Sequence, residues 1–418
     1  MQAIILQKFS LTFLLCFSIS LLQAQDFKYC NEALFQSFLQ SGQKHLASFA
    51  FSKVIESYQT AERYACNEED IAAVKELIKA SISGMKKARA LRLHGLAIKD
   101  LPISLDQLKK IKKLTFFRVQ FDDFPIEAFQ LNQLTLFTIV DTPIEHFPSD
   151  VKQLVNLERL SLSNNQLSSL PSEIGQLEKL ESMSIRKNQL EQIPPEIGQL
   201  DSLEFLTIET NKLVQLPDEI VQLHQLEYLI LTENQLKELP LQIGQLNQLK
   251  TLNLNKNALT ILPNSIGQLD NLKTLAIAQN QLQQLPPEIG DLKNINLLNL
   301  SSNKLQNLPA EIGNLHTLEK LYLSNNPLQA IPKEIGQLQQ LTTLDLRNTL
   351  IERLPAEIGQ LQQLSVLDLA ETPIQQFPPE IANCKKLKTI FFQKHTLNET
   401  QLAALQKNLP PGCKLIFK

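Results

Sequence analysis

The sequence predicts an α/β solenoid, in which one short unit made of a strand and a turn is stacked many times. Thirteen prolines stand 23 residues apart from Pro102 to Pro378, and no insertion breaks the interval. Leucines recur at fixed places between them, and one position holds asparagine in eight successive units. A strict period of about 20 to 50 residues is typical of stacked repeats, which usually present a surface to a partner.

The unit from Leu157 to Lys179 shows the pattern, which is LxxLxLxxNxLxxLPxxIGxLxx in general form. Leu160 and Leu162 flank a single residue, so a strand directs both to the buried face and turns Ser161 outward. The pattern extends from Ala88 to Phe392 and predicts about fourteen strands. The proline and glycine of each unit suit an irregular convex turn.

The recurring asparagine is expected to bond the backbone of its own and the adjacent coil, where unpaired peptide groups are costly. Near both ends of the repeat array the position holds other residues, such as Val119 and Thr372, as expected of terminal repeats that become caps. The eight asparagines are Asn165, Asn188, Asn211, Asn234, Asn257, Asn280, Asn303 and Asn326.

These motifs resemble the leucine-rich repeat family in its 23-residue form with an LPxEIGQL segment. Two segments that carry the resemblance are Leu216-Pro217-Asp218-Glu219-Ile220 and Leu308-Pro309-Ala310-Glu311-Ile312-Gly313. The subtype is similar to that of bacterial proteins and of plant intracellular Ras-group proteins. The resemblance implies a horseshoe whose inner, concave side is a parallel sheet that usually binds ligands.

Residues 1–24 are expected to be a secretory signal peptide. Lys8 precedes an apolar stretch of 14 residues from Phe9 to Leu22, and Ala24 is the expected cleavage position. The stretch is too short to span a bilayer comfortably, so we expect export from a bacterial cell to the periplasm, the cell surface or the medium, with no membrane span in the mature chain. A buried N-terminal helix in a cytoplasmic protein is the alternative.

The remaining chain divides into three segments. Residues 25–87 lack the period and have apolar residues at helical spacing, which predicts a helical N-terminal cap or a tetratricopeptide-like docking segment. Residues 88–397 hold the repeats. Residues 398–418 are expected to be a C-terminal cap with a helix that starts near Asn398 and a final strand.

Four cysteines remain after removal of the predicted signal peptide. An even number in an exported protein suggests disulfides between Cys30 and Cys66 and between Cys384 and Cys413, each stabilising one cap. Four free, buried thiols are the alternative.

No pattern of catalytic or metal-binding residues is present in the sequence. GxSxG, HExxH and glycine-rich phosphate loops are absent, and no histidine lies at metal-ligand spacing from another histidine or a cysteine pair. We therefore expect no enzyme, metal or cofactor. A net charge of −3 and a pI near 6.1 give no indication of nucleic-acid binding.

Candidate binding residues are those directed to the concave face beside the strand leucines. Exposed aromatic side chains bordered by charge are typical of interaction hot spots, although they can also simply pair across strands and cover the sheet. Two adjacent repeats stand out by this criterion, with the candidates Phe205, Thr207, Glu209, Tyr228, Ile230 and Glu233. Secondary candidates are Phe117, Leu136 and Val140 near one end and Tyr322, Asp345, Asp368 and Phe391 near the other.

The sequence thus favours a noncatalytic module that binds a protein, or alternatively a glycan, on its concave face. Phe205 and Tyr228 are the expected anchors, and Glu209 and Glu233 are expected to select a complementary surface. An intracellular scaffold or signalling regulator, as the Ras-group resemblance implies, and an adhesive surface protein without a dedicated ligand remain alternatives.

Overall fold

The computed structural model describes residues 36–41, 57, 60–61, 72–74, 77, 90–94, 98, 105–121, 124–393 and 397–417. The chain divides into two compact units, Met1–Asn188 and Gln189–Lys418, which are described separately below. The predicted signal segment 1–24 and the predicted Cys30–Cys66 disulfide lie outside the described residues. Within 25–87, the few described residues are helical, and Ala61, Val74 and Leu77 are buried.

The first unit contains five described strands, and each pairs in parallel with the next in register. They are β1 (Ala90–His94), β2 (Lys113–Phe117), β3 (Leu136–Val140), β4 (Arg159–Ser163) and β5 (Ser182–Ser184). Short helical turns return the chain between strands. They are α5 (Leu105–Leu108), η2 (Ile126–Gln130), η3 (Ser149–Gln153) and η4 (Ser172–Gln176).

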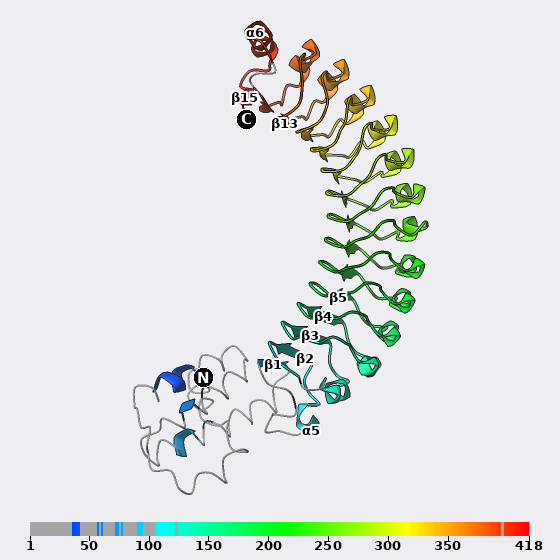
Figure 1. Ribbon diagram of the computed structural model, residues 1–418, viewed down its shortest axis with the longest axis vertical. Helices are drawn as coiled ribbons and strands as arrows, with labels where there is room; N and C mark the ends of the chain where they lie inside the picture. Colours follow the sequence, from blue (N-terminus) through cyan, green and yellow to red (C-terminus); the bar gives the residue numbers. More distant parts are fainter. Residues whose placement is uncertain are drawn as a thin grey trace. The chain divides into compact units, whose positions relative to one another are not determined.

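The second unit continues the same construction with ten described strands, again parallel and in chain order. They are β6 (Phe205–Thr207), β7 (Tyr228–Ile230), β8 (Thr251–Asn253), β9 (Thr274–Ala276), β10 (Leu297–Asn299), β11 (Lys320–Tyr322), β12 (Thr343–Asp345), β13 (Val366–Leu369), β14 (Thr389–Phe392) and β15 (Lys414–Phe417). Within this unit the strands line the inner side of an arc and 3-10 turns line the outer side (Figure 1).

The outer turns of the second unit are 3-10 helices. All of them except η7 begin directly after a proline. They are η5 (Pro195–Gln199), η6 (Asp218–Gln222), η7 (Ile243–Gln245), η8 (Asn264–Gln268), η9 (Pro287–Asp291), η10 (Ala310–Asn314), η11 (Lys333–Gln337), η12 (Ala356–Gln360) and η13 (Pro379–Asn383). The predicted α/β solenoid of parallel strands and convex turns is confirmed.

Most outer turns of the second unit contain a glycine, and there neighbouring turns approach closely. A Cβ on Gly267 would lie 2.3 Å from the backbone oxygen of Glu288, and one on Gly198 would lie 2.5 Å from that of Glu219. Val221 occupies the same position in η6, and the turn that follows it, η7, is shortened to three residues. The sequence analysis related this glycine to the irregular convex turn, whereas the structure shows that the next repeat occupies the space where a side chain would lie.

The core changes character between the units. In the first unit phenylalanine rings contact one another, and Phe137 lies with its ring centre 5.9 to 6.4 Å from those of Phe116, Phe129 and Phe147. In the second unit the buried positions are almost all leucine and isoleucine. In both units the buried side chains lie between strands and turns, which is the arrangement that the repeat pattern predicts.

The predicted asparagine ladder is present, and its side chains hydrogen-bond the backbone at the turn after the strand. Asn280 is 8% exposed and accepts a hydrogen bond from the Leu259 backbone N–H at 3.0 Å. Its Nδ2 donates to the carbonyl of Leu254 at 2.9 Å, one repeat back, and to that of Ile277 at 3.2 Å. One side chain thus satisfies backbone groups of two repeats that water cannot reach.

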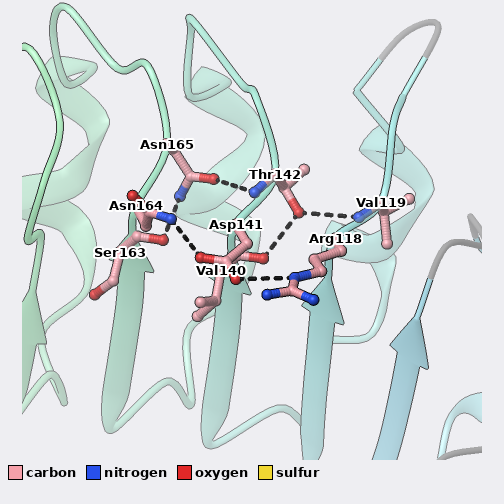
Figure 2. A network of polar contacts seen from close by, with 8 residues as sticks. All are labelled: Arg118, Val119, Val140, Asp141, Thr142, Ser163, Asn164 and Asn165. Carbon is pink, nitrogen blue, oxygen red and sulfur yellow. Dashed lines mark hydrogen bonds and ion pairs between the residues drawn. The ribbon is translucent and has the colours of Figure 1, made fainter.

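Threonine replaces asparagine where this ladder begins in the first unit. Asn165 Oδ1 accepts from the Thr142 backbone N–H at 3.0 Å, and Thr142 Oγ1 accepts from the Val119 N–H at 3.3 Å (Figure 2). Thr142 Oγ1 also donates to the carbonyl of Val140. Because a hydroxyl has one hydrogen, threonine bonds fewer carbonyls than asparagine does.

The residue before each ladder position, which holds asparagine, threonine or, at Val119, valine, has a left-handed backbone although it is not glycine. Asp141 has φ 53°, Glu233 has φ 58°, and ten equivalent residues have φ between 51° and 58°. The ten are Arg118, Asn164, Lys187, Thr210, Lys256, Gln279, Ser302, Asn325, Asn348 and Glu371. Such a conformation costs an L-residue roughly 1–2 kcal/mol, so stacking of the repeats must impose it.

The C-terminal cap consists of α6 (Glu399–Asn408) and β15. Asn398 begins the helix with a reciprocal capping box. Its side-chain oxygen accepts a hydrogen bond from the Gln401 backbone N–H, and the Gln401 side-chain oxygen accepts one from the Asn398 backbone N–H. This confirms the helix start predicted at Asn398, and β15 pairs with β14 as a further parallel strand. Among the described residues, no helix is both long and apolar enough to cross a membrane.

Candidate interaction surface

The concave columns are the strand positions whose side chains point away from the buried leucines, together with the residues that follow each strand. Along β6 and β7, Leu206 and Leu229 are fully buried while their neighbours on either side remain accessible. Parallel register places equivalent residues of successive repeats side by side, about 4.8 Å apart. Each column is therefore a row of side chains along the inner side of its unit.

The aromatic pair predicted from the sequence is present as a stack. Phe205 and Tyr228 lie directly opposite each other in β6 and β7, with ring centres 4.7 Å apart and planes at 6°. Phe205 is 40% exposed, although large apolar side chains in this unit are nearly always buried. Thr207 and Ile230 lie opposite each other two residues on. The structure therefore brings these four candidates together on one surface.

The two candidate glutamates lie beyond the strand ends, and the structure shows that Glu233 is engaged. It accepts a hydrogen bond from Thr210 Oγ1 at 2.9 Å and forms an ion pair with Lys256. Glu209 is half-buried and its backbone carbonyl accepts from Asn211 Nδ2 at 3.2 Å. The acidic border is thus partly neutralised within the protein.

Two lysines of the following repeat, which pair with Glu227 and Glu233, were not among the candidates from the sequence. Lys250 pairs with Glu227 at 2.5 Å, and a hydrogen bond to that carboxylate raises the pKa of Lys250. Lys256 pairs with Glu233 as described above. Each lysine occupies the same column as its glutamate, one repeat later, so a column-by-column comparison of the sequence would have revealed both pairs.

The secondary candidates lie in the concave columns that the period predicted. Asp345 and Asp368 are adjacent in register, and each carboxylate accepts a hydrogen bond from the backbone N–H two residues later, at 3.0 Å from Arg347 and 2.9 Å from Ala370. These bonds give both aspartates a structural role at the strand end. Tyr322 lies opposite Asp345, and Phe391 lies opposite Asp368.

The predicted Cys384–Cys413 disulfide is not present, and both residues are free thiols. Cys384 occupies the place of a core leucine at the end of η13, and its Sγ lies 3.1 Å from the carbonyl of Ile358. Burial raises the pKa of Cys384 to about 11, and Cys413 adds a smaller contribution. The described part of the chain shows no cluster of three or more His, Cys, Asp or Glu arranged to hold a metal ion.

Comparison with known proteins agrees with this geometry. Residues 145–227, 217–300 and 333–407 match the model of the leucine-rich repeat region, and residues 317–338 match that of the single leucine-rich repeat. A leucine-rich repeat protein of Leptospira interrogans is 34% identical over 82% of this chain and 92% of that chain, with a TM-score of 0.65. The chain belongs to the leucine-rich repeat family.

More distant leucine-rich repeat structures share the fold alone. The plant peptide hormone receptor RGFR1 in complex with RGF2 is 22% identical over 83% of this chain and 67% of that chain, with a TM-score of 0.65. An internalin of Listeria monocytogenes is 20% identical over 80% of this chain and 88% of that chain, with a TM-score of 0.58. No curated protein matches the chain.

Proposed function

We propose that this leucine-rich repeat protein is a noncatalytic interaction module that binds a protein partner on the concave columns of its second unit. The observation that carries the proposal is the Phe205–Tyr228 stack. Its rings are held parallel on a surface where polar or small side chains predominate, and Phe205 is 40% exposed. Pre-formed aromatic surface loses little conformational entropy on binding, which makes such residues effective anchors.

Two further features support this function. The strands and turns hold the concave columns rigidly, because asparagines such as Asn211 and Asn234 bond consecutive repeats together. The ion pairs at Glu227 and Glu233 border the stack with charge of both signs. A partner that covers the rings with apolar side chains and matches this border would satisfy both features. A fold relative, RGFR1, was solved in complex with RGF2, which is a precedent for a bound ligand in this fold.

The test is a crosslinked pull-down from the native organism with wild-type protein and with Phe205→Asp plus Tyr228→Asp. A partner captured by the wild type and lost with this variant supports the proposal. The matched control is Thr251→Asp plus Thr274→Asp, which adds the same charge to the same column in β8 and β9. If both variants keep the same partners, or if the control loses them equally, the stack is not the binding site.

We further propose that the protein acts outside the cytoplasm after removal of residues 1–24. The support is the apolar stretch from Phe9 to Leu22 beside Ala24. N-terminal sequencing of the protein isolated from its native cells tests this directly. A mature chain that begins at Gln25 agrees with export, whereas an intact Met1 in a cytoplasmic fraction would favour the intracellular scaffold.

A further inference from the structure

The first unit presents a concave surface whose charge is opposite to that of the second. Among its described concave positions six are basic and one, Asp141, is acidic. In the same columns of the second unit four are basic and five are acidic. The six basic residues of the first unit are all exposed, and they are Arg92, Lys113, Arg118, Arg159, Arg186 and Lys187.

Phe117 organises the centre of this surface. The guanidinium carbon of Arg92, from β1, lies 5.3 Å from the centre of the Phe117 ring, and that of Arg118 lies 5.0 Å from it. A cation over an aromatic face at this distance is attracted by the ring. The ring therefore holds two arginines from neighbouring repeats together, although their charges repel each other.

Asp141 shows how this cluster receives a carboxylate. Its Oδ2 accepts from Arg118 Nε at 3.2 Å, and its Oδ1 accepts from Asn164 Nδ2 at 2.5 Å (Figure 2). These contacts, first the Asn164 hydrogen bond and then Arg118, lower the pKa of Asp141 and keep it ionised. Because Arg118 uses Nε for this pair, its two terminal nitrogens can donate hydrogen bonds to further carboxylates, as can those of Arg92.

We propose that the basic face, defined as Arg92, Lys113, Phe117, Arg118 and Arg159, binds a carboxylate-rich segment of a protein partner. Charge complementarity selects the acidic partner, since one internal aspartate leaves most of the positive charge unneutralised. A nucleic acid fits less well, because the only aromatic ring of this face is covered by guanidinium groups and cannot stack on bases. The proposal is independent of the Phe205–Tyr228 stack, which lies in the other unit.

The test measures fluorescence anisotropy with three probes of matched labelling on the full-length protein. They are a peptide of alternating glutamate and serine, an oligothymidylate of equal net charge, and heparin. The wild type should bind the glutamate peptide, and Arg92→Gln plus Arg118→Gln should weaken its binding roughly tenfold or more. Circular dichroism and melting curves confirm that each variant is folded.

Two matched variants distinguish a specific site from general charge attraction. Lys109→Gln plus Lys152→Gln removes the same charge from the first unit outside the basic face and should leave binding unchanged. Arg92→Lys plus Arg118→Lys keeps the charge but removes the planar donor pairs, so binding should still weaken. Equal loss in the Lys109 and Lys152 variant, or unchanged binding in the arginine-to-lysine variant, would overturn the proposal.

The oligothymidylate and heparin probes test whether the basic face binds another class of partner. If oligothymidylate or heparin binds more tightly than the peptide and depends on the same arginines, the face recognises phosphate or sulfate polymers and the acidic-protein proposal is wrong. If no probe binds in a manner that depends on Arg92 and Arg118, the basic face has no such role. Neither result changes the standing of the pull-down experiment on the second unit.

Discussion

The two units use the same repeat but differ in what they bury and in what they expose. The first has interlocked phenylalanines in its core, threonine or valine at the start of the polar ladder, and a basic concave face around Phe117. The second has a leucine core, a ladder of six asparagines followed by Thr349 and Thr372, and a stacked Phe205–Tyr228 pair bordered by ion pairs. The repeat therefore fixes where the backbone lies, but it leaves the type of side chain at many positions free to differ.

This difference suggests that each unit can be altered without loss of the other. In a solenoid every repeat contacts only its neighbours, so a change in one region has mostly local energetic consequences. The cores and ladders set the stability of each unit, whereas the concave columns set the choice of partner. The following predictions test whether these two sets of residues are as separate as the structure indicates.

The largest effect is expected from Phe137→Ala in the first core. Phe137 is fully buried and contacts three other rings, so truncation should lower the free energy of unfolding by about 3–5 kcal/mol. Chemical denaturation followed by circular dichroism measures this change. Because the loss is local, anisotropy with the glutamate peptide should weaken while the second-unit pull-down persists. Equal loss of both activities would mean that the units are not energetically separate.

An intermediate effect is expected from the asparagine ladder of the second unit. Asn280→Ala leaves the buried Leu259 N–H unpaired, whereas the Leu254 carbonyl keeps its hydrogen bond from Asn257 Nδ2, so the variant should cost about 1–3 kcal/mol of unfolding free energy. Asn280→Thr introduces the residue that the first unit uses at Thr142, and it should cost less because one hydroxyl replaces part of the bonding. If both variants are equally unstable, threonine is not the functional equivalent that the first unit suggests.

The smallest effect concerns Cys384, which occupies a position where the first unit has Leu177. Burial raises the pKa of this thiol from 9.0 to about 11, so the folded state holds its proton more tightly than the unfolded state does. The stability that this confers is complete below pH 9 and is lost as the pH rises towards 11. Cys384→Leu should therefore flatten the decline of the melting temperature between these pH values.

A Cys413→Ser variant controls for the second thiol, whose pKa burial also raises. Lysines titrate in the same pH range and also change the melting temperature. Because they are the same in the wild type and in both variants, their effect cancels when the melting temperatures are compared. A wild-type decline no steeper than that of Cys384→Leu would mean that the thiol is ionised in the folded protein at its usual pKa.

The sequence predicted the repeat, the ladder and the place of the aromatic pair because each depends on periodicity. Phe205 and Tyr228 are 23 residues apart, so a register of one repeat per strand places them side by side. The disulfide expected between Cys384 and Cys413 was wrong because that prediction did not use the periodicity. Pairing by count ignored that Cys384 falls where the repeat requires a buried leucine.

The basic face could not be inferred from total charge, because acidic residues elsewhere in the chain balance it. The sequence analysis noted Phe117 but not the two arginines that cover it. Arg118 lies at a bend position, where a side chain can turn towards several neighbours, and periodicity does not determine which one it meets. A count of charges by unit and column would have found the excess, although not the contact with the ring.

The twelve left-handed residues that follow the strands offer an unusual experimental opportunity. Glycine adopts this backbone conformation without strain, so replacement by glycine at these positions removes a side chain while the local conformation is retained. Alanine, the standard choice for mapping interfaces, would keep the strain of a Cβ there. Glycine scanning from Arg118 to Glu371 would therefore map the functional contribution of one complete edge of the concave surface, repeat by repeat, with little disturbance of the scaffold.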